Sequence, residues 1–171
     1  QLHNAAVALT AATVMQQRGW HITDEQIREG LASVRWPGRF DVRRTDPLFI
    51  IDGGHNPQCI QALAKNIQDY LADRPLTILT GVLADKDYNC MYRNVEPYAK
   101  EFITVTPGNP RALNAHELAK YLSQFGKPVT ACDAVADGVR LAVDHAGKDG
   151  VVLCYGSLYM IGEIEAGLQR L

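Results

Sequence analysis

The stretch LFIIDGGHNP, residues 48–57, decides the fold. Its first four residues, 48–51, are all apolar and have the length of a buried β-strand. Asp52 and two glycines follow, and glycines allow a tight turn. Asn56 is a favoured helix N-cap, and Pro57 suits the first position of a helix. The stretch therefore predicts a strand, a short loop and the start of a helix, in that order.

The sequence beyond this stretch alternates between helical and strand patterns. Strands such as 76–82 and 151–155 are continuously apolar, as strands covered on both faces of a sheet are. A strand at 40–44 precedes 48–51 across an Asp-Pro pair, which predicts a β-hairpin. The other elements that we expect are helix 57–72, helix 88–99, strand 101–106, helix 115–125, strand 128–131, helix 133–146 and helix 157–170. We therefore predict an α/β fold with a doubly wound, mostly parallel, Rossmann-like sheet and an antiparallel edge hairpin.

Two helical patterns precede the hairpin. Residues 4–18 are rich in Ala and apolar at helical spacing, and Gly19 ends that helix. Thr23 is followed three residues later by Gln26, which is the signature of a capping box at the start of helix 24–33. We expect these helices to be the tail of a preceding domain together with a linker.

This interpretation divides the chain into two parts. Residues 1–35 form the helical tail and linker, and residues 36–171 form the second domain. The chain begins with Gln1 rather than Met, from which we expect a fragment of a longer protein.

The composition is that of a soluble globular protein. Of 171 residues, 47% are apolar and 21% charged, and the formal net charge is -2. Because there is no basic field, we expect neither nucleic acid nor a membrane surface as a partner. No apolar run approaches the roughly 18 residues of a membrane span. The four cysteines lack CxxC or CxxH spacing, so we expect free thiols in a reducing cytoplasm and no zinc site.

Ligands of doubly wound sheets bind beyond the carboxyl ends of the strands, so the loops after the predicted strands are candidate sites. Asp52 leaves the end of a strand in a position suited to a ribose hydroxyl, and His55 lies beside the start of the next helix. Arg39, in the turn WPGRF, carries a planar guanidinium suited to phosphate. The structural alternatives are a capped turn with a solvated Asp and His, and a surface ion pair for Arg39.

Three further residues lie in such loops. Lys86, within DKD, and Arg111, within NPR, are suited to an anionic substrate. Ser157 opens the last helix, where exposed amides favour anions. An ordinary capping turn or surface turn is the alternative for each of them. The sequence contains neither a GxxxxGK[ST] phosphate loop nor a GxSxG nucleophile elbow.

The order of these blocks is more informative than any one of them. WPGRF, DGGHNP, a strand with DKD, NPRAL and YGSLYMIGEI follow one another along residues 36–164. In this order they closely resemble the C-terminal region of bacterial folylpolyglutamate synthases, many of which are also dihydrofolate synthases, in the Mur ligase superfamily. The resemblance implies a Mur ligase C-terminal domain at 36–171. It also identifies residues 1–35 as the end of that family's central ATPase domain.

The same resemblance implies an ATP-dependent ligase that joins L-glutamate to the carboxylate of a folate or dihydropteroate through an acyl phosphate, with Mg²⁺. In the family, the central domain supplies the phosphate loop and most metal ligands, and the C-terminal domain closes over ATP and helps to bind glutamate. We therefore expect this fragment to be inactive alone. We expect a cytoplasmic monomer whose partners are ATP, a folate or dihydropteroate, glutamate and the rest of its own chain.

Site residues carry over by matching position. The positions that match nucleotide contacts of the family are Asn4, Arg39, Asp52 and His55. The cleft positions assigned to glutamate or to domain closure are Lys86, Arg111 and Ser157. No catalytic and no metal-binding residue is expected in this chain. Gly54 stands where the family often has Ala, a change that we expect the turn to tolerate.

Two other interpretations stay open. One is the C-terminal domain of a Mur peptidoglycan ligase, although WPGRF and DKD favour the folate branch. The other is a stand-alone module that binds a nucleotide or a small acid without chemistry.

Overall fold

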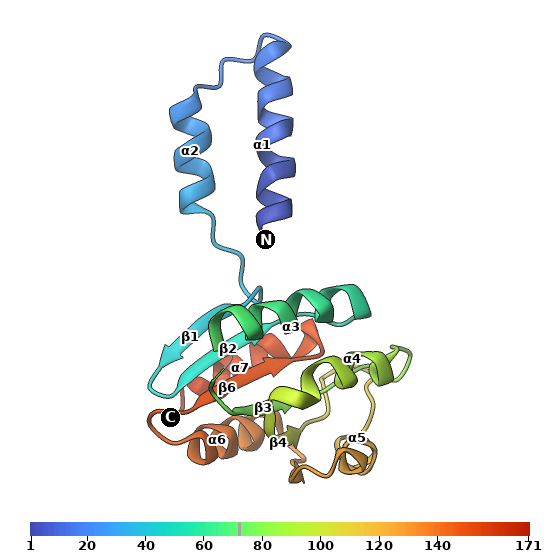
Figure 1. Cartoon of the computed structure of the whole chain (residues 1–171). Helices are drawn as coiled ribbons and strands as arrows, with labels where there is room; N and C mark the ends of the chain where they lie inside the picture. The colour runs from blue at the N-terminus through green and yellow to red at the C-terminus, as the bar shows by residue number, and fades with distance from the viewer. Residues whose placement is uncertain (72) are drawn as a thin grey trace. The chain divides into compact units, whose positions relative to one another are not determined.

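A computed structural model describes residues 1–71 and 73–171 (Figure 1). Contacts divide the chain into two compact units, Gln1–Trp36 and Pro37–Leu171. Residue 72, the last residue of the predicted helix 57–72, lies outside the described residues.

The first unit is a pair of helices, α1 (Leu2–Gln17) and α2 (Asp24–Ser33). The predicted capping box at the start of α2 is confirmed. The Thr23 hydroxyl accepts a bond from the Gln26 N–H at 3.2 Å, and the Gln26 side chain accepts one from the Thr23 N–H at 2.9 Å. No residue of α1 is buried, and Leu2 is 89% exposed. The pair therefore has no apolar core of its own.

The second unit is built on a six-stranded sheet with the order β1-β2-β6-β3-β4-β5. Only β1 and β2 pair antiparallel, and the other neighbours pair parallel. The strands are β1 (Asp41–Thr45), β2 (Leu48–Asp52), β3 (Leu76–Thr80), β4 (Ala99–Thr104), β5 (Val129–Ala131) and β6 (Val151–Tyr155). This arrangement confirms the predicted doubly wound sheet with its antiparallel edge hairpin.

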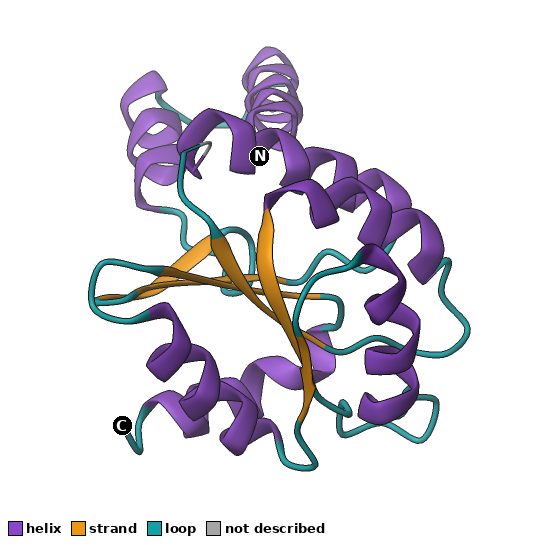
Figure 2. Ribbon diagram, turned by 60° about the horizontal axis from the view of Figure 1, so that its bottom comes forward, coloured by secondary structure: helices purple, strands orange, loops and turns teal. Residues whose placement is uncertain are grey.

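Helices cover both faces of this sheet (Figure 2). The helices on one face are α3 (Pro57–Leu71), α4 (Tyr88–Val95) and α5 (Ala115–Leu122). The helices on the other face are α6 (Val135–Ala146) and α7 (Ile161–Leu168). The described residues also form the short 3₁₀ helices η1 (Glu96–Tyr98), η2 (Ser123–Phe125) and η3 (Leu158–Met160).

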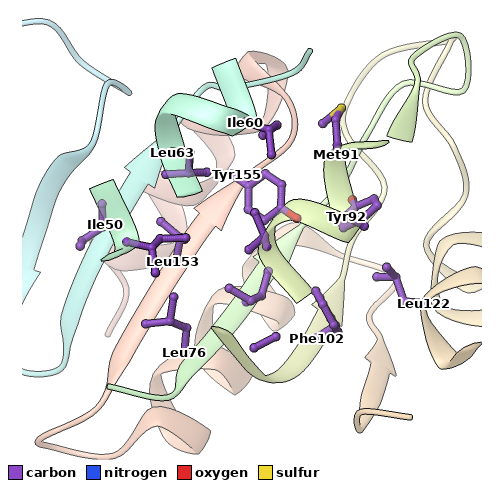
Figure 3. Close-up of a cluster of buried hydrophobic side chains, with 14 of the residues drawn as sticks. Ile50, Ile60, Leu63, Leu76, Met91, Tyr92, Phe102, Leu122, Leu153 and Tyr155 are labelled. Carbon is purple, nitrogen blue, oxygen red and sulfur yellow. The ribbon is translucent and has the colours of Figure 1, made fainter. Parts of the chain in front are cut away.

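Two apolar cores, one on each face, explain why the strands are continuously apolar. Along β2, Ile50 packs with α3 and α4, whereas Phe49 and Ile51 pack with α6 and α7. Side chains alternate between the faces of a strand, so a strand covered on both faces needs an apolar residue at every position. Figure 3 shows side chains of the first core, among them Ile50 of β2, Ile60 of α3 and Leu153 of β6.

Some predicted boundaries were wrong. The predicted helix 88–99 ends at Val95, because Pro97 has no N–H to continue the helical hydrogen bonds. The chain instead forms η1, and β4 begins at Ala99. The predicted strand 76–82 ends at Thr80. There the chain turns at Gly81, where a side chain would come within 2.5 Å of the Val105 carbonyl oxygen.

The topology fixes where a ligand site can form. β2, β6 and β3 are neighbouring parallel strands, so their carboxyl ends share one edge of the sheet. The chain leaves β2 and β3 toward the face covered by α3 and α4, but it leaves β6 toward α7 on the other face. Loops that diverge from neighbouring strands create a crevice between them, which is the usual ligand site of such sheets.

Candidate functional site

Three segments meet at the carboxyl ends of β2 and β6. They are the turn 38–40 before β1, the loop after β2 and the start of the loop after β6. The Gly53 N–H donates to the Gly38 carbonyl oxygen at 2.7 Å, and the Gly156 N–H donates to the Gly54 carbonyl oxygen at 3.1 Å. These backbone bonds join the three segments into one unit.

Asp52, the last residue of β2, joins two of these segments through its side chain. Its Oδ2 accepts a hydrogen bond from the Phe40 N–H at 2.9 Å, and its Oδ1 accepts one from the Gly54 N–H at 2.8 Å. Burial raises the pKa of this carboxyl group above its ordinary value, while the two backbone bonds and the charge of Arg39 act in the opposite direction. Asp52 is therefore a structural acceptor here as well as a candidate ligand contact.

Arg39 lies between two residues of unusual backbone conformation. Gly38 has φ +72° and Phe40 has φ +50°, and the latter value is rare for a residue with a side chain. Arg39 is half-buried, and within residues 1–71 and 73–171 its guanidinium makes no hydrogen bond or ion pair. Arg43, by contrast, pairs with Glu165 at 2.6 Å. The surface ion pair considered for Arg39 is thus not formed with any described residue.

His55 and Asn56 shape the start of α3. The Nδ1 of His55 lies 2.9 Å from the Gly53 carbonyl oxygen. A carbonyl can only accept, so Nδ1 carries the proton and a neutral His55 has Nε2 as an acceptor. The Asn56 side chain accepts a bond from the Cys59 N–H at 2.9 Å, which confirms the predicted helix cap.

Two glycines are required where the loops approach one another. A side chain at Gly53 would overlap Leu158 at the start of η3. Gly156 has φ +118°, and a side chain there would come within 2.5 Å of the Gly81 carbonyl oxygen. The loops after β3 and β6 therefore pack backbone against backbone, and the loop after β2 packs at Gly53 against the side chain of Leu158.

Lys86 and Arg111 lie in two loops that pair with each other. The Ala84 N–H donates to the Arg111 carbonyl oxygen at 2.8 Å. The Arg111 guanidinium also bonds to Asp85 at 2.7 Å, and both side chains are about half exposed, at 55% and 48%. Lys86 is half-buried, while Asp87 caps α4 through the Cys90 N–H. The structure thus brings Lys86 and Arg111 together, with Arg111 already engaged by a carboxylate.

Ser157 and Asn4 lie in different surroundings. Ser157 is buried, and its hydroxyl accepts a bond from the Tyr159 N–H at 3.3 Å, so it caps η3. Asn4 is exposed in α1 and bonds to the side chain of Gln1 at 3.0 Å. Because Asn4 belongs to the first unit, its placement relative to Arg39 and Asp52 is not defined.

Phe40 is a site residue that the sequence reasoning did not single out. Its backbone N–H donates a hydrogen bond to the Asp52 carboxylate. The signal was available, because the predicted hairpin implied which residues face each other. The register pairs Asp41 with Ile51, which places Phe40 beside Asp52.

Among the described residues there is neither a cluster of side chains that could hold a metal ion nor a helix that could cross a membrane. Residues 1–71 and 73–171 contain no group of three or more His, Cys, Asp or Glu side chains that could hold a metal ion. No helix among them is long and apolar enough to cross a membrane.

The glutamate ligase domain of Mur ligases matches this chain over residues 38–158. The chain belongs to this family. The matched range of the Mur ligase domain begins at Gly38 and ends at Leu158. Gly38 lies in the turn before β1 and accepts a hydrogen bond from the Gly53 N–H, and Leu158, the first residue of η3, approaches Gly53 with its side chain.

Individual relatives agree with this assignment. The domain is 39% identical to a folylpolyglutamate synthase of Lacticaseibacillus casei over 115 residues, which is 66% of this chain and 27% of that protein. It is 29% identical to a dihydrofolate synthase/folylpolyglutamate synthase of Bacillus subtilis over 170 residues, 99% of this chain and 39% of that protein. The chain thus spans well under half the length of these relatives.

A solved structure shares the fold. It is the bifunctional folylpolyglutamate synthase/dihydrofolate synthase described with Mn, AMPPNP and L-glutamate bound. It matches this Mur ligase domain with a TM-score of 0.81 and 28% identity, over 94% of this chain and 38% of that one. The ligand-free bifunctional folylpolyglutamate synthase/dihydrofolate synthase of Yersinia pestis also matches, with a TM-score of 0.80 and 28% identity, over 94% of this chain and 38% of that one.

Proposed function

We propose that this chain is the C-terminal part of an ATP-dependent ligase that joins L-glutamate to the carboxylate of a folate or dihydropteroate. The proposal is supported by membership of the Mur ligase glutamate ligase family and by relatives that are folylpolyglutamate and dihydrofolate synthases. The whole enzyme would be a cytoplasmic monomer. Residues 1–35 would be the end of its central domain and residues 36–171 its closing domain, a division that the two compact units support.

The single observation that carries the proposal is the joined turn and loop around Arg39 and Asp52. The Arg39 guanidinium is half-buried and has no partner among the described residues. It lies near the carboxyl ends of the strands, where doubly wound sheets bind ligands. A planar guanidinium with five donors matches the oxygens of a polyphosphate. We assign Arg39 to the ATP phosphates, Asp52 and His55 to the nucleotide-binding site beside Arg39, and Asn4 to nucleotide binding as well.

A second group is assigned to glutamate or to domain closure. It consists of Lys86, Arg111 and Ser157. Lys86 and Arg111 offer positive charge from the paired loops after β3 and β4. Their charge suits the carboxylates of glutamate. To bind such a carboxylate, Arg111 would have to break or share its ion pair with Asp85. Ser157 is buried, so we assign it to holding the loop after β6 during closure.

ATP would transfer its γ-phosphoryl group to the folate carboxylate, which forms an acyl phosphate and releases ADP. The glutamate amine would then attack the acyl carbon, form the amide and release phosphate. The residues of this chain bind and orient the nucleotide and exclude water, and none of them attacks the substrate. The resemblance to the family implies that Mg²⁺ would be held mainly by other domains of the whole protein.

The test is an assay of the full-length protein that contains this chain. We expect phosphate release from ATP that requires both L-glutamate and either dihydropteroate or a reduced folate. Release only with a UDP-muramoyl acceptor would move the assignment to the peptidoglycan branch of the family. No turnover of ATP with either acceptor would favour a nucleotide- or acid-binding module and refute the proposal.

A further inference from the structure

The turn that carries Arg39 is fixed on both sides by the loop after β2. On one side, the Gly38 carbonyl oxygen accepts from the Gly53 N–H at 2.7 Å. On the other side, the Phe40 N–H donates to the Asp52 carboxylate at 2.9 Å. The backbone on either side of Arg39 is therefore tied to one short segment.

The turn needs such fixing because its own conformation is unfavourable. Phe40 has φ +50°, a conformation that residues with a side chain rarely adopt, and it persists only where surrounding contacts hold it. The hydrogen bond that holds Phe40 is donated by its N–H to Oδ2 of Asp52. The other carboxylate oxygen, Oδ1, accepts a hydrogen bond from the Gly54 N–H at 2.8 Å. The carboxylate is thus a bridge between the loop after β2 and the residue that follows Arg39.

We propose that Asp52 is a positioning residue, whose carboxylate acts on ATP use through Arg39 by holding the turn 38–40 in place. This inference rests on the proposed function, in which Arg39 binds the ATP phosphates. It differs from a direct contact between Asp52 and the ribose, which the resemblance to the family implies.

The chemistry of the two oxygens separates these roles. Both oxygens of Asp52 accept from backbone N–H groups. An asparagine amide has one acceptor and one donor, so in either orientation its NH₂ would face a backbone N–H. A ribose hydroxyl can both donate and accept, so an asparagine could still bond to it. Asp52→Asn should therefore be as harmful as Asp52→Ala if Asp52 positions Arg39, and mild if it contacts only the ribose.

The experiment is a double-mutant cycle in the full-length protein. The variants are Asp52→Asn, Asp52→Ala, Arg39→Ala and the Arg39→Ala/Asp52→Ala double variant. We expect each single variant to raise the KM for ATP by about tenfold to a hundredfold, as loss of a charge-assisted hydrogen bond does, with the KM for glutamate unchanged. The double variant should be no worse than Arg39→Ala, because both changes remove the same interaction.

A matched control separates positioning from a general loss of charge. Asp133→Asn changes another carboxyl group of the second unit, one that is exposed and bonded to His116. We expect it to leave the KM for ATP unchanged. Thermal unfolding of every variant shows whether it is folded.

Hydrogen exchange gives a readout that does not depend on activity. In the wild-type full-length protein, the peptide that contains Phe40 should be protected before any nucleotide is added. Asp52→Asn should lose this protection, and Asp133→Asn should keep it. Fast exchange at Phe40 in the wild type would overturn the inference even if no variant folds.

The kinetic outcomes are equally decisive. Near-wild-type KM for Asp52→Asn, or effects of Arg39→Ala and Asp52→Ala that multiply, would overturn the positioning role. Wild-type protein without glutamate-dependent turnover would refute the proposed function instead, and the exchange at Phe40 would still decide whether Asp52 holds the turn.

Discussion

Replacing Gly156 by Ala should disrupt the packing of loops at the candidate site. Gly156 follows β6 with φ +118°, and an added Cβ would lie 2.5 Å from the Gly81 carbonyl oxygen and 3.0 Å from the Thr80 hydroxyl oxygen. A residue forced into such a conformation costs about 1–3 kcal/mol. Overlap with a packed backbone costs about 1–3 kcal/mol more. We therefore expect Gly156→Ala to lower the free energy of unfolding by about 2–6 kcal/mol.

Gly162 is the matched control. It lies in α7, and an added Cβ there would have no atom within 4 Å outside its own helical turn. Alanine favours a helix over glycine by about 0.5–1 kcal/mol, so Gly162→Ala should leave stability unchanged or raise it slightly.

The assay can report on the second unit alone. All seven tyrosines of the chain lie in Pro37–Leu171, and both tryptophans lie in Gln1–Trp36. Urea unfolding followed by tyrosine absorbance therefore measures the unit that contains Gly156. Unfolding of Gly156→Ala at the same urea concentration as the wild type would refute the account of the packed loops.

Two further predictions concern buried polar groups. Tyr92 and Tyr155 are both buried, but the Tyr92 hydroxyl bonds to Thr80 at 2.8 Å while the Tyr155 hydroxyl has no partner among the described residues. In urea unfolding, Tyr92→Phe should lower the free energy of unfolding by about 0.5–1.5 kcal/mol, whereas Tyr155→Phe should leave it unchanged or raise it. An equal loss of stability in both variants would contradict this account. The carboxyl group of Asp52 should titrate above its ordinary pKa of 3.8 by NMR, and Arg39→Ala should raise that pKa further, because Arg39 lowers it. Since the native state then binds the proton more tightly than the unfolded chain, the proton-linked contribution of Asp52 to stability is complete below pH 3.8 and is lost as the pH rises through the raised pKa.

Much of this fold could be predicted from local chemistry. The apolar run 48–51, the Asn56 cap and the Thr23 capping box all depend on neighbouring residues, and the structure confirms them. The hairpin even implied that Phe40 would face Asp52. The predicted helix 88–99 is too long, because Pro97 lacks the N–H that would continue the helical hydrogen bonds beyond Val95.

The rest depended on tertiary contacts between distant parts of the sequence. Gly81 and Gly156 lie 75 positions apart in the sequence numbering, and nothing local indicates that their backbones touch. The pairing of Arg111 with Asp85 likewise depends on two loops that the sheet brings together. The matching blocks therefore predicted which loops carry the candidate site, but they did not predict which side chains there would already be engaged.

The most direct test of the central claim is the product of the full-length enzyme, measured by mass spectrometry. With ATP, L-glutamate and dihydropteroate or a reduced folate, we predict an acceptor heavier by one glutamyl residue, with one phosphate released for each amide formed. Hydrolysis of ATP without this product, or a glutamyl product formed only on a UDP-muramoyl acceptor, would contradict the claim.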